Sequence, residues 1–147
     1  LPPGMTGSIG TYAFYSCSSL ASVDLPVATS ISSNAFYSCS ALTTVSLPAV
    51  TSIGSNAFQS CSALTTVSLP AVTSIGSYAF RYCSALTSLI LSKNQVATLS
   101  STSAFTGTPI ASGTGYIYVP DDLVDQYKAA NNWATYANKI LPISQKP

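Results

Sequence analysis

Residues 31–52 and 53–74 have almost the same sequence, and this repetition limits the possible folds more than any other feature of the chain. The two segments read ISSNAFYSCSALTTVSLPAVTS and IGSNAFQSCSALTTVSLPAVTS. They differ at only two places, Ser32/Gly54 and Tyr37/Gln59. Self-similarity at a fixed spacing of roughly 20 to 50 residues is typical of proteins in which similar units stack. The sequence therefore predicts a solenoid in which each coil uses 22 residues.

The repeat continues on both sides of this pair. Aligning the units predicts about five coils, near residues 9–30, 31–52, 53–74, 75–96 and 97–119. The last coil keeps only anchor positions, which are Leu99 for the usual Ile, Ala104 and Phe105 for Ala-Phe, and Ile117 to Pro120 for the strand. It also carries about three extra residues near Gly113 to Gly115. Terminal units of repeat arrays are commonly atypical, so we expect the solenoid to occupy residues 1–119.

The apolar residues inside one unit predict how a coil is folded. Leu64, Val67 and Leu69 form an L-x-x-V-x-L pattern whose last two members alternate with a serine, as in a strand with one buried face. Pro70 ends that strand because proline has no N–H to donate. A second extended stretch is expected at residues 72–75, and the remaining residues return the chain along the outer side. One coil cannot bury enough apolar surface to fold alone, so we expect a mainly β solenoid with parallel strands about 4.8 Å apart.

The pattern of apolar residues changes after residue 119 from that of strands to that of helices. One segment has apolar side chains at helical spacing at Leu123, Val124, Tyr127 and Ala130. A second segment, which ends before Pro142, has them at Trp133, Tyr136 and Ile140. Asp121 and Asp122 are expected to cap the first helix and to complement its dipole. Residues 120–147 are therefore predicted to form a helical cap over the last coil.

Charge and residue content exclude several classes of function. With five basic and four acidic residues, the chain has no cationic surface for nucleic acid or anionic membrane. No apolar run approaches the roughly 18 residues of a membrane span. The chain has no His and no Glu, which excludes a His-based triad and a paired-glutamate glycosidase. The acids Asp24, Asp121, Asp122 and Asp125 are expected to cap turns and helices. We therefore expect no enzymatic activity, no cofactor and no metal.

The cysteines fall at one position of each of four units: Cys17, Cys39, Cys61 and Cys83. Because all four occupy the same position of the repeat unit, we expect their side chains to stack in a column. A zinc site would need two pairs that converge, usually from C-x-x-C. Disulfides between neighbouring coils would need Cβ atoms closer than the spacing of parallel strands provides. We expect buried free thiols that act as small apolar side chains.

The repeat unit and the C-terminal segment together resemble a known family. The unit IGSNAFQSCSALTTVSLP, the strand at 115–120 and the segment YKAANNW at 127–133 are similar to BspA-like (Treponema pallidum type) leucine-rich repeat proteins. The resemblance covers nearly the whole chain. It implies a right-handed leucine-rich solenoid from a bacterial cell-surface or secreted protein, some members of the family being adhesins for host matrix proteins. The chain starts at Leu1 without Met, which we interpret as a piece of a longer, secreted protein. The 22-residue unit differs from the 23-residue unit commoner in the family.

Two surfaces are candidates for binding. The outward positions of the main strands, called here the main-strand face, are Thr43, Thr44, Ser46, Thr65, Thr66, Ser68, Thr87, Ser88 and Ile90. The strand face of a solenoid is commonly a concave binding surface, but Ser and Thr also suit strands for structural reasons. On the outer side Tyr15 and Tyr37 are followed by Gln59 and Arg81, with Tyr12, Tyr78 and Tyr82 nearby. These aromatic side chains are expected either to pack the turns, which we favour, or to receive a sugar or a protein.

Two functions fit these features. The first is a non-enzymatic binding module for adhesion or protein–protein interaction, with a host or bacterial surface protein, or a glycan, as partner. The second is a structural spacer in which near-identical coils present other domains of a longer surface protein. The sequence favours the first, and nucleic acid is excluded as a partner by the low charge.

Overall fold

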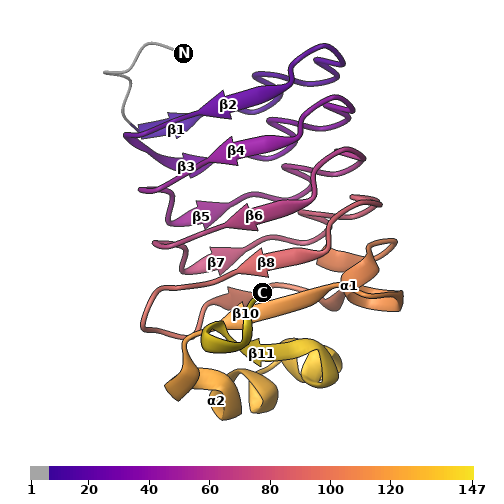
Figure 1. The fold of residues 1–147 in the computed structure, drawn as a ribbon. Coiled ribbons are helices and arrows are strands. Elements are labelled where there is room, and N and C mark those ends of the chain that lie inside the picture. Colours follow the sequence, from indigo (N-terminus) through magenta and orange to yellow (C-terminus); the bar gives the residue numbers. More distant parts are fainter. Residues whose placement is uncertain (1–6) are drawn as a thin grey trace.

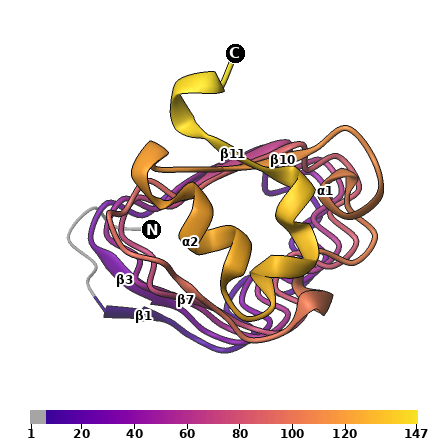
Figure 2. The same ribbon diagram turned by 90° about the horizontal axis from the view of Figure 1, so that it is seen from below.

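The computed structural model describes residues 7–147, which form a stack of coils closed at the C-terminal end by helical segments (Figure 1). The predicted start of the solenoid at residues 1–6 lies outside the described residues. Each full coil contains two short strands and one long outer turn. Seen along the axis, the coils lie directly over one another (Figure 2). The repeat solenoid predicted from the sequence is thereby confirmed.

The main strands occur where the L-x-x-V-x-L pattern predicts them. They are β2 (Ser22–Asp24), β4 (Thr44–Ser46), β6 (Thr66–Ser68), β8 (Ser88–Ile90) and β10 (Tyr116–Val119). All their pairings are parallel, and residues one unit apart are partners, as Val67 is with Leu89 and Leu89 is with Ile117. The last pairing confirms that Ile117 takes the strand position in the atypical fifth coil.

The second extended stretch of each unit forms a separate parallel sheet. Its strands are β1 (Gly7–Ile9), β3 (Ala28–Ile31), β5 (Ser52–Ile53), β7 (Ser74–Ile75) and β9 (Thr98–Leu99), in that spatial order. Ile53 pairs with Ile75 and Ile75 with Leu99, so Leu99 replaces the isoleucine as expected. Gly54 and Gly76, which follow these strands, lie where the coils approach most closely. A Cβ atom on Gly76 would lie 2.7 Å from the amide nitrogen of Ser55.

The outer turns are joined by a third set of hydrogen bonds between coils. The N–H groups of Asn34, Phe36 and Ser38 donate to carbonyl oxygens of the next coil at 3.0, 2.8 and 2.8 Å. Two residues of the turn, four positions apart, have positive φ, as at Asn34 (59°) and Ser38 (58°). A type II turn needs this conformation at its third residue, where Gly and Asn are favoured. Asn therefore suits this position in the second and third coils, whereas Tyr12 and Tyr78 hold it in the first and fourth.

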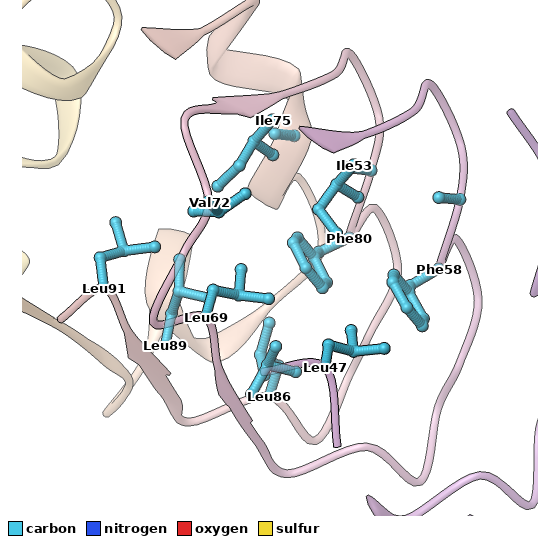
Figure 3. Packing of buried hydrophobic residues seen from close by; sticks show 14 of the residues in the cluster. Leu47, Ile53, Phe58, Leu69, Val72, Ile75, Phe80, Leu86, Leu89 and Leu91 are labelled. Atoms are coloured by element: carbon cyan, nitrogen blue, oxygen red, sulfur yellow. The ribbon is translucent and has the colours of Figure 1, made fainter. Parts of the chain in front are cut away.

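The core is a set of columns in which equal positions of successive coils touch. Figure 3 shows leucine, isoleucine and phenylalanine side chains from neighbouring coils packed together inside the stack. The rings of Phe14, Phe36, Phe58, Phe80 and Phe105 stack with centroids 5.1 to 6.0 Å apart and nearly parallel planes. Such a column buries large apolar area at every coil interface and fixes the vertical register of the coils.

The four cysteines are free and form the expected column. The Cys61 thiol donates to the Phe36 carbonyl at 3.1 Å, and the Cys83 thiol donates to the Phe58 carbonyl at 3.0 Å. Burial raises the pKa of Cys39 to about 11. The Cys39 thiol is therefore a protonated donor near neutral pH, while Cys17 in the first coil is only partly buried.

Short helical elements occupy the fifth coil and the cap. They are η1 (Thr102–Phe105), α1 (Pro109–Ser112), η2 (Asp121–Leu123), α2 (Val124–Ala129), η3 (Trp133–Lys139) and η4 (Ile143–Gln145). The element α1 directly precedes the extra residues of the fifth coil and η1 lies in its outer turn, and neither was expected. Figure 2 shows α2 and η3 lying across the open end of the stack.

Two details of the predicted cap are wrong. Ile140 does not extend a helical face but begins β11 (Ile140–Pro142), which pairs in parallel with β10 and ends the main sheet. Pro142 is compatible with this position because β11 is an edge strand. Asp121 makes no side-chain cap bond at η2. Its carboxylate accepts the Ser144 N–H at 3.1 Å, and hydrogen bonds from Ser144 lower its pKa.

Side chains of the cap take the place of a following coil. They bond to backbone groups of the fifth coil that a sixth coil would otherwise satisfy. The bonds run from Tyr127 Oη to Gln95 O, from Ala97 N to Tyr127 Oη, from Trp133 Nε1 to Ala97 O, from Asn132 Nδ2 to Leu99 O and from Tyr136 Oη to Thr102 O. Buried backbone groups without partners are costly, so the cap stabilises both the apolar and the polar edge of the last coil.

Candidate binding surfaces

The nine residues of the main-strand face lie on one side of the main strands. Seven of them are exposed, while Ser88 and Ile90 are half-buried. The intervening residues Val45, Val67 and Leu89 point to the core, as the alternation predicts. The main-strand face is therefore a surface of hydroxyl and methyl groups on a rigid backbone, with no charged side chain among the nine.

Some of these hydroxyl groups form hydrogen bonds within the protein and others do not. Thr43 Oγ1 donates to Ala21 O at 3.1 Å, and Thr87 Oγ1 donates to Thr65 O at 3.4 Å. These bonds run along the stack and support the structural role of threonine. Within the described residues, Thr44, Thr66 and Ser68 use no side-chain hydrogen bond, so their hydroxyl groups remain available to a partner.

The main-strand face continues into the fifth coil through two residues that the sequence reasoning missed. Tyr116 pairs with Ser88, and Tyr118 pairs with Ile90, so both point outward. Tyr116 is half-buried and lies 5.2 Å below the Lys139 ammonium, whereas only 5% of Tyr118 is exposed. The alternation of the two tyrosines with Ile117 and Val119 could have indicated these outward positions from the sequence. The hydroxyl surface thus ends at the half-buried Tyr116.

The sheet under the main-strand face is interrupted between β4 and β6. Strands β2 and β4 form one sheet, and β6, β8, β10 and β11 form another. Within the described residues, Thr65 N does not bond Thr43 O and Leu47 N does not bond Ser68 O, although the equivalent bonds form at neighbouring coils. A cavity of about 170 Å³ lies at this seam, lined by Val45, Ser46, Leu47, Pro48, Ser68 and Pro70.

The missing bonds give a prediction for amide exchange. We expect the amide of Thr65 to exchange at least about tenfold faster than that of Thr43, and the amide of Leu47 to exchange faster than that of Leu69, because protection follows hydrogen bonding and local stability. Each pair has the same neighbours in sequence, Ala-Leu-Thr-Thr and Val-Ser-Leu-Pro, so intrinsic rates match. Hydrogen exchange followed by NMR would measure them. Equal protection within both pairs would mean that the seam closes in solution.

The outer turns carry the exposed tyrosines. The exposed fractions are 57% for Tyr12, 47% for Tyr15, 39% for Tyr78 and 44% for Tyr82. Tyr15 stacks on Tyr37 with ring centroids 5.1 Å apart, so packing explains part of this column. It does not explain the solvent-facing surface of the other rings, which makes the outer turns a second candidate surface.

A groove of about 510 Å³ lies beside the second sheet. Its walls are mainly serines repeated at the unit spacing, among them Ser30, Ser52 and Ser74. The Ser at this position of each unit was visible in the sequence but was not singled out. The groove contains no charged or aromatic residue, so its lining indicates no ligand class.

Two further features were sought in the described part of the chain, a metal site and a membrane-spanning helix. Residues 7–147 contain no cluster of three or more His, Cys, Asp or Glu side chains that could hold a metal ion. No helix among them has the length and hydropathy to span a membrane.

The chain was compared with protein families and with known proteins. A family model for BspA-type leucine-rich repeat regions matches residues 7–123 in six copies. The comparison with curated proteins gave no match. Among solved structures, the leucine-rich repeat protein of T. pallidum is similar with a TM-score of 0.68 and 28% identity, over 82% of this chain and 56% of that chain.

A leucine-rich repeat protein from Bacteroides ovatus is similar with a TM-score of 0.65 and 26% identity, over 97% of this chain and 41% of that chain. The chain therefore spans about half the length of the solved structures it matches. The repeat unit, the parallel strands and the match over residues 7–123 lead to one assignment. The chain belongs to the BspA-type leucine-rich repeat family.

Proposed function

We propose that the chain is a non-enzymatic binding module of a bacterial cell-surface or secreted protein, and that its main-strand face contacts a host or bacterial surface protein in adhesion. The family is one of protein-interaction repeats, which supports binding in general. The observation that carries the proposal is the field of unoccupied hydroxyl groups at Thr44, Thr66 and Ser68, which is held on parallel strands and ends at Tyr116.

The chemistry of this face suits a polar, wet contact. Hydroxyl groups can donate and accept, and they can bind through bridging water molecules. The half-buried Tyr116 ring adds an aromatic contact at the end of this face, and aromatic residues are enriched at protein interfaces. Because the nine residues include no charge, we expect association to depend little on salt.

The alternative function is a rigid spacer in a longer surface protein. It is favoured by the near identity of residues 31–52 and 53–74, which a binding surface does not require. It is also consistent with relatives that are about twice as long. In this case the coils would set distance and orientation, and the main-strand face would carry no partner.

Thr66→Lys separates the two functions. Thr66 is exposed at the centre of the main-strand face, so a long charged side chain there should block a partner without disturbing the core. We expect binding to a panel of purified host extracellular-matrix proteins, measured by surface plasmon resonance, to weaken by about tenfold or more. Tm should change little, because surface substitutions typically cost within about 0.5 kcal/mol.

Ser62→Lys is the matched control. Ser62 is exposed in the same coil but lies outside the main-strand face, and its side chain makes no hydrogen bond in the described residues. Binding should survive this substitution. If Thr66→Lys and Ser62→Lys leave every interaction equally intact, the spacer function is favoured.

A further inference from the structure

The outer turn of the fourth coil departs from the repeat in a concerted way. Residues 75–86 read IGSYAFRYCSAL, whereas residues 53–64 read IGSNAFQSCSAL. Only three positions differ, where Tyr78, Arg81 and Tyr82 replace Asn56, Gln59 and Ser60. Tyr78 has a precedent in Tyr12 of the first coil, whereas Arg81 and Tyr82 have none at their positions in the first three coils, so these two changes call for a common cause.

These three side chains form one cluster. The Arg81 guanidinium carbon lies 5.0 Å from the centroid of the Tyr78 ring and 4.4 Å from that of the Tyr82 ring. Arg81 Nη2 donates to Tyr82 Oη at 2.7 Å, and Arg81 Nε is buried without a hydrogen-bond partner. The guanidinium is therefore held in place by two aromatic rings, and N–H groups of its terminal nitrogens remain free to donate.

The backbone does not favour this choice of residues. Tyr78 and Tyr82 have φ of 60° and 62°, the same left-handed conformation as Asn56 (61°) and Ser60 (63°). Asn tolerates this conformation, whereas a bulky aromatic residue rarely adopts it. The rings gain only partial burial in return, since 39% of Tyr78 and 44% of Tyr82 are exposed. Residues kept in unfavourable conformations cluster at functional sites.

The charge of Arg81 has no counterpart in the fold. The chain has four acidic residues, of which Asp24 lies in β2 and the other three in the cap. Within the described residues, none of them lies within the 4.0 Å of an ion pair with Arg81. A partly buried guanidinium that lacks an anion is a ready site for one, and a carboxylate matches its paired N–H groups best.

We propose that Tyr78, Arg81 and Tyr82 form a binding site for the carboxylated sugar of an acidic glycan, on the opposite side of each coil from the main-strand face. The carboxylate pairs with the free guanidinium N–H groups of Arg81. The C–H face of the pyranose packs on the exposed Tyr78 ring, whose electron-rich face attracts polarised C–H bonds. The exposed tyrosine rings also carry hydroxyl groups that can make polar contacts to sugar hydroxyls.

The backbone of the turn argues against an extended peptide as the ligand. Phe80 N donates to Ala104 O at 2.9 Å, and Tyr82 N donates to Thr106 O at 2.8 Å. These amides are used between coils, so a peptide strand could not pair with them as it does at a free sheet edge. Recognition must come from side chains, which suits a sugar ring with one acidic group.

The test uses three probes and substitutions taken from the chain itself. The probes are an oligosaccharide that ends in glucuronic acid, its counterpart that ends in glucose, and an Asp-containing tripeptide, each titrated by calorimetry. Arg81→Gln, Tyr78→Asn and Tyr82→Ser each restore the residue that the third coil has at that position, so the fold accepts them by internal precedent. Tyr37→Gln, which likewise restores a third-coil residue, is the control away from the site.

We expect the acidic oligosaccharide to bind the unaltered chain and the other two probes to bind at least about tenfold more weakly. Arg81→Gln should weaken binding by roughly 10- to 100-fold, as for a lost charged hydrogen bond. Tyr78→Asn and Tyr82→Ser should weaken it less, Tyr37→Gln should not weaken it, and Tm should stay the same or rise in the three variants of the cluster. The proposal is overturned by absent binding of the acidic oligosaccharide, by equal binding of the glucose or Asp probe, or by loss of Tm that accounts for the loss of binding, since the cluster would then serve packing alone.

Discussion

Leu64→Asp is expected to abolish the cooperative fold of the central coils. Leu64 is fully buried, and Leu42 and Leu86 hold the same position in the coils on either side. A carboxylate there would lie in the leucine column without a partner, and buried unpaired charges cost several kcal/mol. The free energy of unfolding of a domain this size is about 5 to 15 kcal/mol. Circular dichroism should show little strand signal or a large fall in Tm.

Thr65→Asp is the matched control for this prediction. It places the same carboxylate one residue further along, on the exposed side of the strand, where the cost should stay within about 0.5 kcal/mol. The coil model requires the two variants to differ sharply. Similar stability of Leu64→Asp and Thr65→Asp would refute the assignment of inward and outward positions.

Trp133→Ala is expected to have the second largest effect, because the cap depends on this side chain. Trp133 is fully buried, its ring centroid lies 6.1 Å from that of Phe105, and its Nε1 donates to Ala97 O at 2.7 Å. Truncating a buried Trp costs about 3 to 5 kcal/mol. At roughly 2 to 4 °C per kcal/mol, Tm should fall by about 6 to 20 °C, as measured by circular dichroism.

Trp133→Phe separates packing from hydrogen bonding. It keeps a ring next to Phe105 but leaves the Ala97 carbonyl unpaired, for which we expect a loss of about 1 to 3 kcal/mol. The fifth coil should lose hydrogen-exchange protection first, since each coil is stabilised by its neighbours. Unchanged Tm in both variants would mean that the cap is dispensable for the stack.

Much of the fold could be predicted because an alignment of the repeats shows which residues of neighbouring coils lie next to each other. Two copies of one unit fix which residues stack, and the alternation of Val67, Ser68 and Leu69 fixes which side chains are buried. Even the atypical fifth coil could be aligned, since Leu99, Phe105 and Ile117 keep apolar character at the anchor positions. The cysteine column was expected because each Cys occupies the same position of its repeat unit.

The cap was less predictable because it has no repeat to align with. Ile140 fits a helical face by spacing, but its partner in space is Ile117, which makes the strand pairing of β11 more favourable. Asp121 resembles a helix cap in sequence, yet Ser144 reaches it from the C-terminal turn. Both errors come from contacts between residues far apart in the chain, which local patterns do not contain.

The candidate surfaces were predicted in part. The alternation in the strands predicted outward positions at Thr44, Ser46, Thr66, Ser68, Ser88 and Ile90, but the continuation of the face to Tyr116 required the alignment to be extended into the irregular coil. The sequence shows where the outer tyrosines occur. It does not show the positive φ angles of Tyr78 and Tyr82 or the contact of their rings with Arg81. The conformational cost of these tyrosines and their contacts with Arg81 depend on the three-dimensional structure of the turn.

The hydrogen bonds of the outer turns all run in one direction, and this gives the stack a polarity. Every donor among Asn34, Phe36 and Ser38 faces the following coil, so the carbonyl groups of each turn face the preceding one. A coil can join the row in a single orientation only. At this row a coil stacked in the opposite sense would set oxygen against oxygen, so the outer turns favour neighbours of the same sense.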